Sequence, residues 1–301
     1  MHYIIAFLFI ASAAYGQDTR SVTEPSFPPV CSQLDAQLVK SGPAGIPLSS
    51  ETAFDTARIQ SALELCAQGQ AVELRPAGSN NAFLLAPIRI PSGVTLLVDA
   101  GITVFASRNP RDYDANSGKT CGTITSDGSG CLPLIAANGS DAAGIMGFGV
   151  IDGRGHLPMI VNGGVSGISW WDLANQANTA GLNQNNPRLI QINNTKGFTL
   201  YKITLMNAAK FHVALGTCTN FTAWGVKIIT PYDARNTDGI DPGYSSNVTI
   251  TNSYISAGDD NVAIGGNSNP GASNISVTNN YFGDGHGASI GSYTLAGVSN
   301  V

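Results

Sequence analysis

Hydrophobic residues beyond position 50 lie mostly in short runs separated by glycine, asparagine, serine and threonine. Short apolar runs between turn-forming residues are typical of β-strands. One stretch, 50–67, differs because its apolar residues recur at the spacing of an amphipathic helix, with Ser50 or Thr52 as the expected cap. The pattern therefore predicts one helix followed by many strands. The clearest expected strands are 71–74, 83–85, 94–98 and 102–105.

A weak repeat runs through the chain from about residue 190 onward. Its aligned hydrophobic positions are Phe198, Phe221, Val248, Ile275 and Val301, so the spacings are 23, 27, 27 and 26 residues. A period in the twenties with strand-like composition indicates a parallel β-helix, because the signature of leucine-rich repeats is absent. A β-sandwich is the structural alternative, but it would show alternation and hairpin turns without a fixed period.

The repeat also predicts how the chain is organised. One coil cannot bury its own apolar face, so a β-helix is stabilised by stacking, and we expect the helix at 50–67 to cap the open end. We expect a leader at 1–16, a Pro- and Ser-rich extension at 17–49 that leads loosely into the domain, and a β-helix domain at 50–301. The last copy of the repeat begins at Ser299 and stops at Val301, directly after a coil begins, so we expect a domain truncated at its C-terminal end.

The leader has the pattern of a secretory signal peptide. Residues 4–15 are apolar, and Ala14-Tyr15-Gly16 forms a small-x-small cleavage pattern. The apolar run is too short to span a membrane. We therefore expect a secreted, extracellular protein that is not attached to a membrane.

The cysteines agree with export, because disulfides persist in oxidising compartments. Cys121 and Cys131 enclose a Gly/Ser-rich loop and are expected to form a bridge, and Cys31 is expected to pair with Cys66. Cys218 would then be unpaired or have its partner outside this chain; the alternative is that all five are buried thiols. Five Asn-x-Ser/Thr sequences predict glycosylation in a host with that machinery. They begin at Asn138, Asn193, Asn220, Asn247 and Asn274.

Charge narrows the class of partner. Only 12% of residues are charged, the formal net charge is −5, and no long basic run exists. These features argue against nucleic acid as a partner. An acidic protein suits a polyanionic substrate only if cations are concentrated locally.

The candidate chemistry lies in the last third of the chain. Asp238 precedes Asp260 by 22 residues and Asp260 precedes His286 by 26, close to the period of the repeat, and Asp259 is adjacent. Stacking the coils would bring these side chains together. Clustered carboxylates cannot all ionise freely, so one would be kept protonated as a general acid while the others activate water. A site of this kind could cleave a bond between two sugars. The neighbouring glycines are expected to allow tight turns and the approach of a bulky polymer.

These motifs resemble the polygalacturonases of glycoside hydrolase family 28. The resemblance rests on several segments in the family's order. They are 147–155 (GFGVIDGRG), 211–213 (FHV), 236–238 (NTD), 258–260 (GDD) and 285–292 (GHGASIGS).

The resemblance implies a right-handed parallel β-helix and hydrolysis of α-1,4-linked galacturonan, a pectin polysaccharide, with inversion. Asp259 would donate the proton, Asp238 and Asp260 would activate the water, and His286 would maintain the protonation state of Asp259. Asn236 and Asp241 look like supporting or sugar-contacting residues. No metal, cofactor, nucleic acid or membrane is implied, and we expect a monomer.

One departure from the family concerns an Arg-x-Lys motif that grips the substrate carboxylate and a later tyrosine. Both follow the Gly-His-Gly segment in the family, and this chain ends before either. Arg235 and Lys210 cannot be assumed to replace that clamp. Three alternatives to polygalacturonase activity therefore stand: a hydrolase of rhamnogalacturonan or substituted galacturonan, a non-catalytic carbohydrate-binding β-helix, and, less in keeping with an acid and histidine cluster, a pectate lyase.

Other conspicuous residues receive structural interpretations. His212 is expected near the site or packed in a coil, without a catalytic role, and Asp152 and Arg154 are expected to shape a turn. Trp170 and Trp171 suit sugar stacking and packing equally well.

Overall fold

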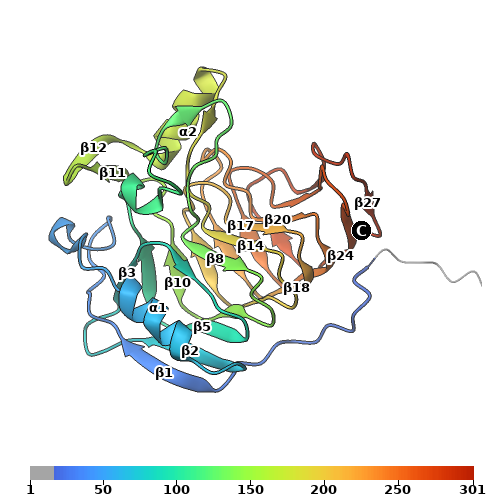
Figure 1. The fold of residues 1–301 in the computed structure, drawn as a ribbon, viewed down its shortest axis with the longest axis horizontal. Coiled ribbons are helices and arrows are strands. Elements are labelled where there is room, and N and C mark those ends of the chain that lie inside the picture. Colours follow the sequence, from blue (N-terminus) through green and yellow to red (C-terminus); the bar gives the residue numbers. More distant parts are fainter. Residues whose placement is uncertain (1–16) are drawn as a thin grey trace, which may run out of the picture.

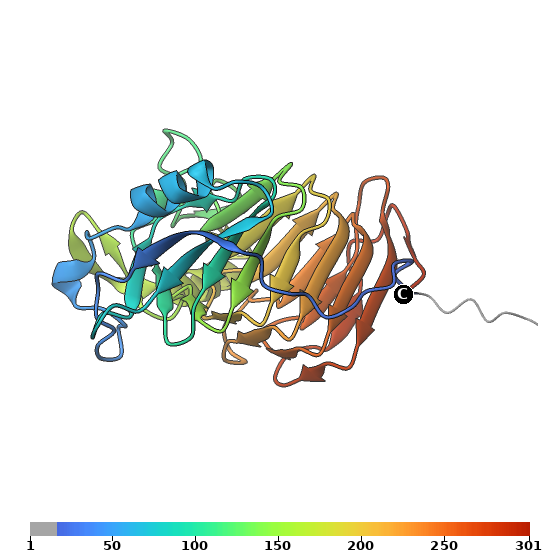
Figure 2. The ribbon, with the colours of Figure 1, turned by 90° about the horizontal axis from the view of Figure 1, so that it is seen from below.

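The structure, a computed structural model, describes residues 17–301, and the predicted signal peptide lies outside the described residues. Over this range the chain winds into a parallel β-helix whose coils stack along the long axis of the molecule (Figures 1 and 2). Three parallel sheets, here called sheets 1, 2 and 3, form its sides. The predicted fold class is therefore confirmed. Between residues 17 and 301, no helix is long and apolar enough to cross a membrane.

Each full coil contributes one short strand to each sheet. Sheet 1 contains β1 (Val30–Asp35), β2 (Gln70–Arg75), β5 (Val94–Val98), β9 (Gly144–Gly147), β15 (Thr199–Tyr201), β18 (Thr219–Trp224), β21 (Ser246–Thr251), β24 (Ala272–Thr278) and β27 (Val298–Ser299). Sheet 2 contains β3 (Ala82–Leu85), β6 (Thr103–Ala106), β10 (Val150–Asp152), β16 (Thr204–Met206), β19 (Lys227–Ile229), β22 (Tyr254–Ser256) and β25 (Tyr281–Phe282). Sheet 3 contains β4 (Ile88–Arg89), β8 (Ile135–Asn138), β14 (Ile190–Asn193), β17 (Val213–Gly216), β20 (Ile240–Gly243), β23 (Val262–Ile264) and β26 (Ala288–Ile290).

Two antiparallel pairs project from the coils. They are β11 (Pro158–Val161) with β12 (Gly164–Ser169), and β7 (Ile124–Thr125) with β13 (Asn183–Gln184).

The predicted repeat is the register of sheet 1. Phe221 pairs with Val248, and Val248 pairs with Ile275. All three side chains are fully buried. Each such residue contributes roughly 1.5–3 kcal/mol by leaving water, so the stack of coils is held together by these aligned apolar positions.

The N-terminal helix exists, but its predicted start was wrong. α1 spans Thr56–Leu65 and is preceded by Asp55, whereas Ser50 ends a separate 3-10 turn, Leu48–Ser50. The Asp55 carboxylate accepts hydrogen bonds from the Leu84 N–H at 2.8 Å and from Arg58 Nε at 2.7 Å, so a coil contact fixes the start of the helix. The buried face of α1 covers the N-terminal coils (Figure 1) through Ile59 and Leu63.

A second helix, α2, was not predicted. It spans Trp170–Thr179 and begins with a capping box between Ser169 and Asp172. Trp170 is 1% exposed, and the Trp171 indole N–H donates to the Ala208 carbonyl at 2.9 Å. Both tryptophans therefore hold α2 on the coils, and the sugar-stacking interpretation of Trp170 is wrong.

The stretch at 17–27 is not loose, contrary to our expectation. It lies along the outer face of sheet 1 as far as the last coils (Figure 2). Arg20 donates to the carbonyls of Asn220, Phe221 and Asn247, and Asp18 accepts a hydrogen bond from Thr249. This segment therefore ties several coils together.

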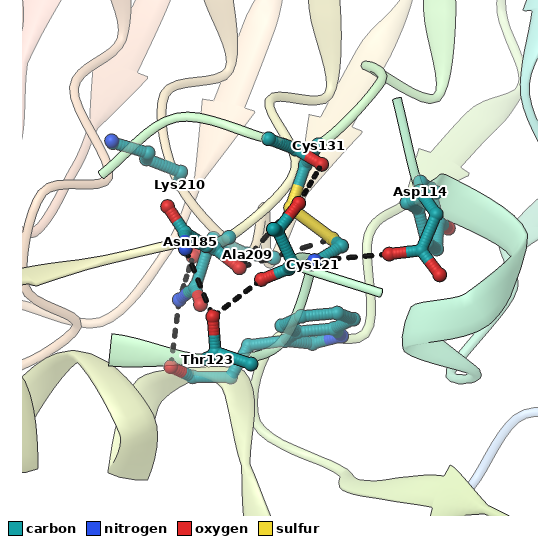
Figure 3. Close-up of a disulfide and its surroundings, with 12 residues drawn as sticks. Asp114, Cys121, Thr123, Cys131, Asn185, Ala209 and Lys210 are labelled. Atoms are coloured by element: carbon teal, nitrogen blue, oxygen red, sulfur yellow. Dashed lines mark hydrogen bonds between the residues drawn. A yellow bond between two sulfur atoms is a disulfide. The ribbon is translucent and has the colours of Figure 1, made fainter. Parts of the chain in front are cut away.

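Both predicted disulfides are present, Cys31–Cys66 and Cys121–Cys131, and Cys218 is unpaired and buried. Figure 3 shows the second bridge, which closes a loop beside Asn185 and Lys210. The Cys121 N–H donates to the Asp114 carboxylate at 3.0 Å, so the loop is also anchored to the chain that precedes it.

Candidate active site

The register of sheet 3 aligns the candidate residues. Ile190, Val213, Ile240, Val262 and Ala288 are paired in succession from β14 to β26. The residue two positions before each of these therefore occupies the same place in its coil, and parallel strands are about 4.8 Å apart. These residues are Arg188, Phe211, Asp238, Asp260 and His286.

The same corner continues the backbone ladder. The His212 N–H donates to the Asp238 carbonyl, and the Gly239 N–H donates to the Asp260 carbonyl, both at 2.9 Å. The structure thus brings Asp238, Asp260 and His286 onto neighbouring coils, as the spacing predicted.

Asp259 lies where the cluster meets solvent. Its Oδ1 is 3.3 Å from His286 Nδ1, and its Oδ2 accepts a hydrogen bond from the Asn236 amide at 3.1 Å. The Gln184 amide donates to Asn236 at 2.9 Å and orients it. The Asp259 side chain is 25% exposed and that of His286 is 54% exposed, so both are accessible to a large substrate.

Asp260 is held from the next coil. The Ser289 hydroxyl donates to its Oδ1 at 2.6 Å, and His286 Nδ1 lies 3.7 Å from the same oxygen. Ser289 was missed in the sequence, although its place in the Gly-His-Gly segment puts it one coil after Asp260.

Asp238 and Asp241 are buried at the base of the cluster. Each has one carboxylate oxygen, Oδ1, that is buried without a hydrogen-bond partner within residues 17–301. Burial, followed by the nearby charge of Asp259, raises the pKa of Asp238 to about 8. Burial and the Asp238 charge raise the pKa of Asp241 well above its usual range, and Arg188 opposes this effect. A cluster of this kind retains a proton at neutral pH.

His212 supports the base of the site. It is fully buried, its Nδ1 is 3.0 Å from the Asp238 carbonyl, and its Nε2 is 2.8 Å from the Thr230 hydroxyl. Burial lowers the pKa of His212 to about 4, so the ring is neutral at pH 7. Because the carbonyl can only accept, Nδ1 carries the proton and Nε2 accepts from Thr230. His212 thus positions the Asp238 backbone, and it is packed in a coil near the site, as expected.

The glycines of the cluster serve the coils themselves. A Cβ at Gly258 would collide with the Ala234 backbone, and one at Gly285 would lie 2.5 Å from the Asn261 side chain. Gly285 also has φ of +132°, a conformation that favours glycine. At these two positions, close approach between coils explains the glycine without the bulky polymer that we expected.

The other residues singled out in the sequence are structural. Arg154 is 1% exposed and forms an ion pair with Glu51 at 2.8 Å, and Asp152 accepts a hydrogen bond from the Arg154 N–H. Arg154 also has φ of +50°, so the turn that we predicted is present.

Known proteins of one family are similar to this chain. The family model described as glycosyl hydrolases family 28 matches residues 76–301. An endo-polygalacturonase of Pectobacterium carotovorum is 46% identical over 295 residues, which are 98% of this chain and 68% of the relative. A polygalacturonase of Ralstonia solanacearum is 41% identical over 93% of this chain and 59% of the relative.

Solved polygalacturonase structures also resemble the fold of this chain. A polygalacturonase from Erwinia carotovora has a TM-score of 0.85 and 43% identity over 94% of this chain and 70% of that structure. An exopolygalacturonase from Thermotoga maritima, at 19% identity and a TM-score of 0.67, shares the fold. The family match covers most of the chain, and two relatives exceed 40% identity over nearly all of it. The chain therefore belongs to the glycosyl hydrolases of family 28.

Proposed function

We propose that this protein is a secreted, monomeric polygalacturonase that hydrolyses α-1,4-galacturonan in pectin with inversion. The observation that carries the proposal is the gathering of three carboxyls and a histidine at one corner of adjacent coils, with two of the acids at the surface and one buried. The relatives named polygalacturonase support the same activity. The chain spans 59–70% of the length of these relatives and of the similar solved structure. Their activity is therefore proposed for this chain.

The proposed reaction begins at Asp259. Asp259 donates its proton to the glycosidic oxygen, the bond from that oxygen to the anomeric carbon breaks, and a water oxygen bonds to that carbon from the opposite face. Asp260 and Asp238 hold the water and accept its proton, after the proton that the cluster retains has moved from Asp238 to Asp259. One proton therefore passes from the protein to the leaving sugar and one returns to the protein, so the cluster must hold one proton at the start of each turnover.

Three side chains assist in this scheme. His286 stands 3.3 Å from Asp259 and returns it to the protonated state between turnovers. Asn236 fixes the second oxygen of Asp259. Asp241 lines a cavity that is also bordered by Phe211 and Tyr293, and it is proposed to contact the sugar.

The direct test is product analysis on de-esterified polygalacturonate. Reducing ends should appear, and proton NMR in the first minutes should show the β-anomer, because inversion of an α-linkage releases a β-product. Initial release of the α-anomer would contradict the inverting mechanism. Folded protein that binds the polymer without releasing reducing ends would instead favour a carbohydrate-binding role.

A prediction concerns divalent cations. Ligand atoms of Asp259, Asp260 and His286 lie within 4.8 Å of one another, a grouping that could hold a metal ion. In the proposed mechanism these carboxyls must exchange protons, and a bound cation would prevent that. Hydrolysis should therefore be unchanged in EDTA and should fall when millimolar Zn²⁺ is added. Loss of activity in EDTA that Ca²⁺ restores would contradict the metal-free mechanism.

A further inference from the structure

Two cations lie close to the Phe211 ring, near the acid cluster. Arg188 lies over the Phe211 ring at 5.4 Å from its centroid, and the Lys210 ammonium is also 5.4 Å from it. Arg188 and Phe211 precede β14 and β17 at the same coil position that Asp238 occupies before β20. Arg188 therefore lies two coils, roughly 10 Å, from Asp238 along the axis of the β-helix.

Arg188 is exposed and Lys210 is half-buried, and in the described part of the chain both lack the carboxylate partner that the buried arginines have. Within residues 17–301 the Arg188 side chain forms no ion pair or hydrogen bond, and Lys210 makes only a 3.5 Å contact with the Gly128 carbonyl. Arg108 and Arg154, by contrast, both bind the Glu51 carboxylate. Arg188 and Lys210 are therefore free to bind an anion from outside the chain.

Both cations face a cavity. One cavity, of about 210 Å³, is lined by Arg188, Lys210 and the loop 127–131. An adjoining cavity of about 490 Å³ shares Arg188 and reaches Asp241. The second cavity also has aromatic walls, which suit the faces of sugar rings. They are Phe211, Tyr244 and Tyr293.

The loop that forms one wall is fixed in place. The Cys121–Cys131 disulfide closes it, and the Thr120 hydroxyl donates to the Gly130 carbonyl at 3.0 Å. Lys210 lies beside this loop (Figure 3), and its ammonium contacts Gly128. The loop that borders Lys210 is therefore in place before a ligand binds, which lowers the entropic cost of binding.

We propose that Arg188 and Lys210 form a carboxylate-binding subsite for a uronate residue that lies about two coils from the acid cluster. This inference rests on the proposed function and names the group that binds the chain beyond the cleaved bond. Arginine can bind a carboxylate with two parallel hydrogen bonds, and lysine adds a point charge. Such a subsite would supply the local cations that a polyanionic substrate requires from an acidic protein.

The state of Lys210 agrees with this role. Burial, together with the Arg188 charge, lowers the pKa of Lys210 to about 8. The ammonium is charged at neutral pH, and a bound carboxylate would compensate for the desolvation that weakens its charge.

The test uses an Asp259→Asn background, so that binding is measured without turnover. Calorimetry would compare a tetragalacturonate with its fully methyl-esterified form, and Arg188→Gln should raise the Kd of the free acid about 10- to 100-fold. The Kd of the ester should change less than threefold, because the ester lacks the charge. Arg188→Lys should recover part of the affinity.

Arg89→Gln is the matched control, because Arg89 is an exposed arginine of sheet 3 that lines neither cavity. An unchanged Kd in Arg188→Gln, equal losses for acid and ester, an equal loss in Arg89→Gln, or no binding by the background protein would overturn the subsite. Lys210→Gln serves the same comparison if Arg188→Gln does not fold. If binding depends on Arg188 but the protein with Asp259 intact releases no reducing ends, the subsite is supported and only the proposed function is contradicted.

Discussion

Replacing Asp259 with asparagine is expected to lower kcat on polygalacturonate about 10²- to 10⁴-fold, the usual contribution of a general acid. The asparagine keeps the size of the side chain and removes the proton that the leaving sugar must receive. Asp259 is partly exposed and its carboxylate contacts His286 and Asn236, so the fold should tolerate the change. Reducing-end assays and the thermal midpoint, measured on the same preparations, check both statements.

The control for this variant is Asp233→Asn, which removes the same charge from an exposed residue of the turn before Asn236. Its kcat should stay within about twofold of the original. An unchanged kcat in Asp259→Asn would contradict the assignment of Asp259 as proton donor.

A substrate with a different leaving group can distinguish an acid role of Asp259 from the role of a base. An oligogalacturonide with an activated aryl leaving group needs little protonation, so Asp259→Asn should lose much less activity on it than on the polymer. A variant that lacks a base, such as Asp260→Asn, should lose activity on both substrates. If Asp259→Asn and Asp260→Asn lost the same activity on the activated substrate, Asp259 would not act mainly as the acid.

The repeat in the sequence predicted the fold because each coil must align its apolar residue with the next. Phe221, Val248 and Ile275 are spaced by one coil, and that period cannot change without exposing them. The same periodicity predicted that Asp238, Asp260 and His286 lie on neighbouring coils, since they recur at nearly the same spacing. Long-range order of this kind is readable because stacking makes it periodic.

What could not be predicted depends on contacts that have no period. The start of α1 is set by the Asp55 carboxylate, which binds the Leu84 N–H of a coil 29 residues away. α2 interrupts the strands as an insertion, although Ser169 and Asp172 form a capping box that could have signalled it. Expectations based on local pattern failed where a distant contact decided the outcome.

The sequence did not predict that Arg188 and Lys210 lie together near the acid cluster, for a related reason. Arg188 lies in a coil before the part of the repeat that carries the acids, and only the pairing of β14 with β17 aligns it with them. Lys210 directly precedes the 211–213 segment of the resemblance, but the sequence does not show that it lies beside Arg188. Extending the repeat one coil toward the N-terminus, to β14 (Ile190–Asn193), was the available signal.

Replacing Asp238 with asparagine is expected to lower activity and to raise stability. Activity should fall at least 100-fold, because one of the two groups proposed to activate water is lost. Stability should rise because the carboxylate is buried with one unpartnered oxygen, a costly state for a charge. At pH 8 we expect the variant to gain roughly 2–4 kcal/mol in the free energy of unfolding.

The pKa of Asp238 determines how the stability difference between the variant and the original protein changes with pH. The pKa of Asp238 rises from 3.8 to about 8 on folding, so between about pH 4 and pH 8 the folded protein holds a proton that the unfolded chain releases. Stability contributed by this group therefore falls as pH rises through that window. Asparagine has no proton to lose, so the difference between the variant and the original should be smallest near pH 4 and largest at pH 8.

Thermal unfolding from pH 4 to 8 measures this difference, with Asp260→Asn as the control, because Asp260 is nearer the surface and accepts a hydrogen bond from Ser289. The control should lose activity and show a smaller pH-dependent gain, because it removes only one of the charges beside Asp238. Parallel stability curves for the original and Asp238→Asn would mean that another group holds the retained proton, and Asp241→Asn would identify it if its curve diverges instead. A gain that is largest for Asp238→Asn would show that the protein keeps this acid at a cost to its own stability, which is the cost expected when a buried carboxyl is retained for catalysis.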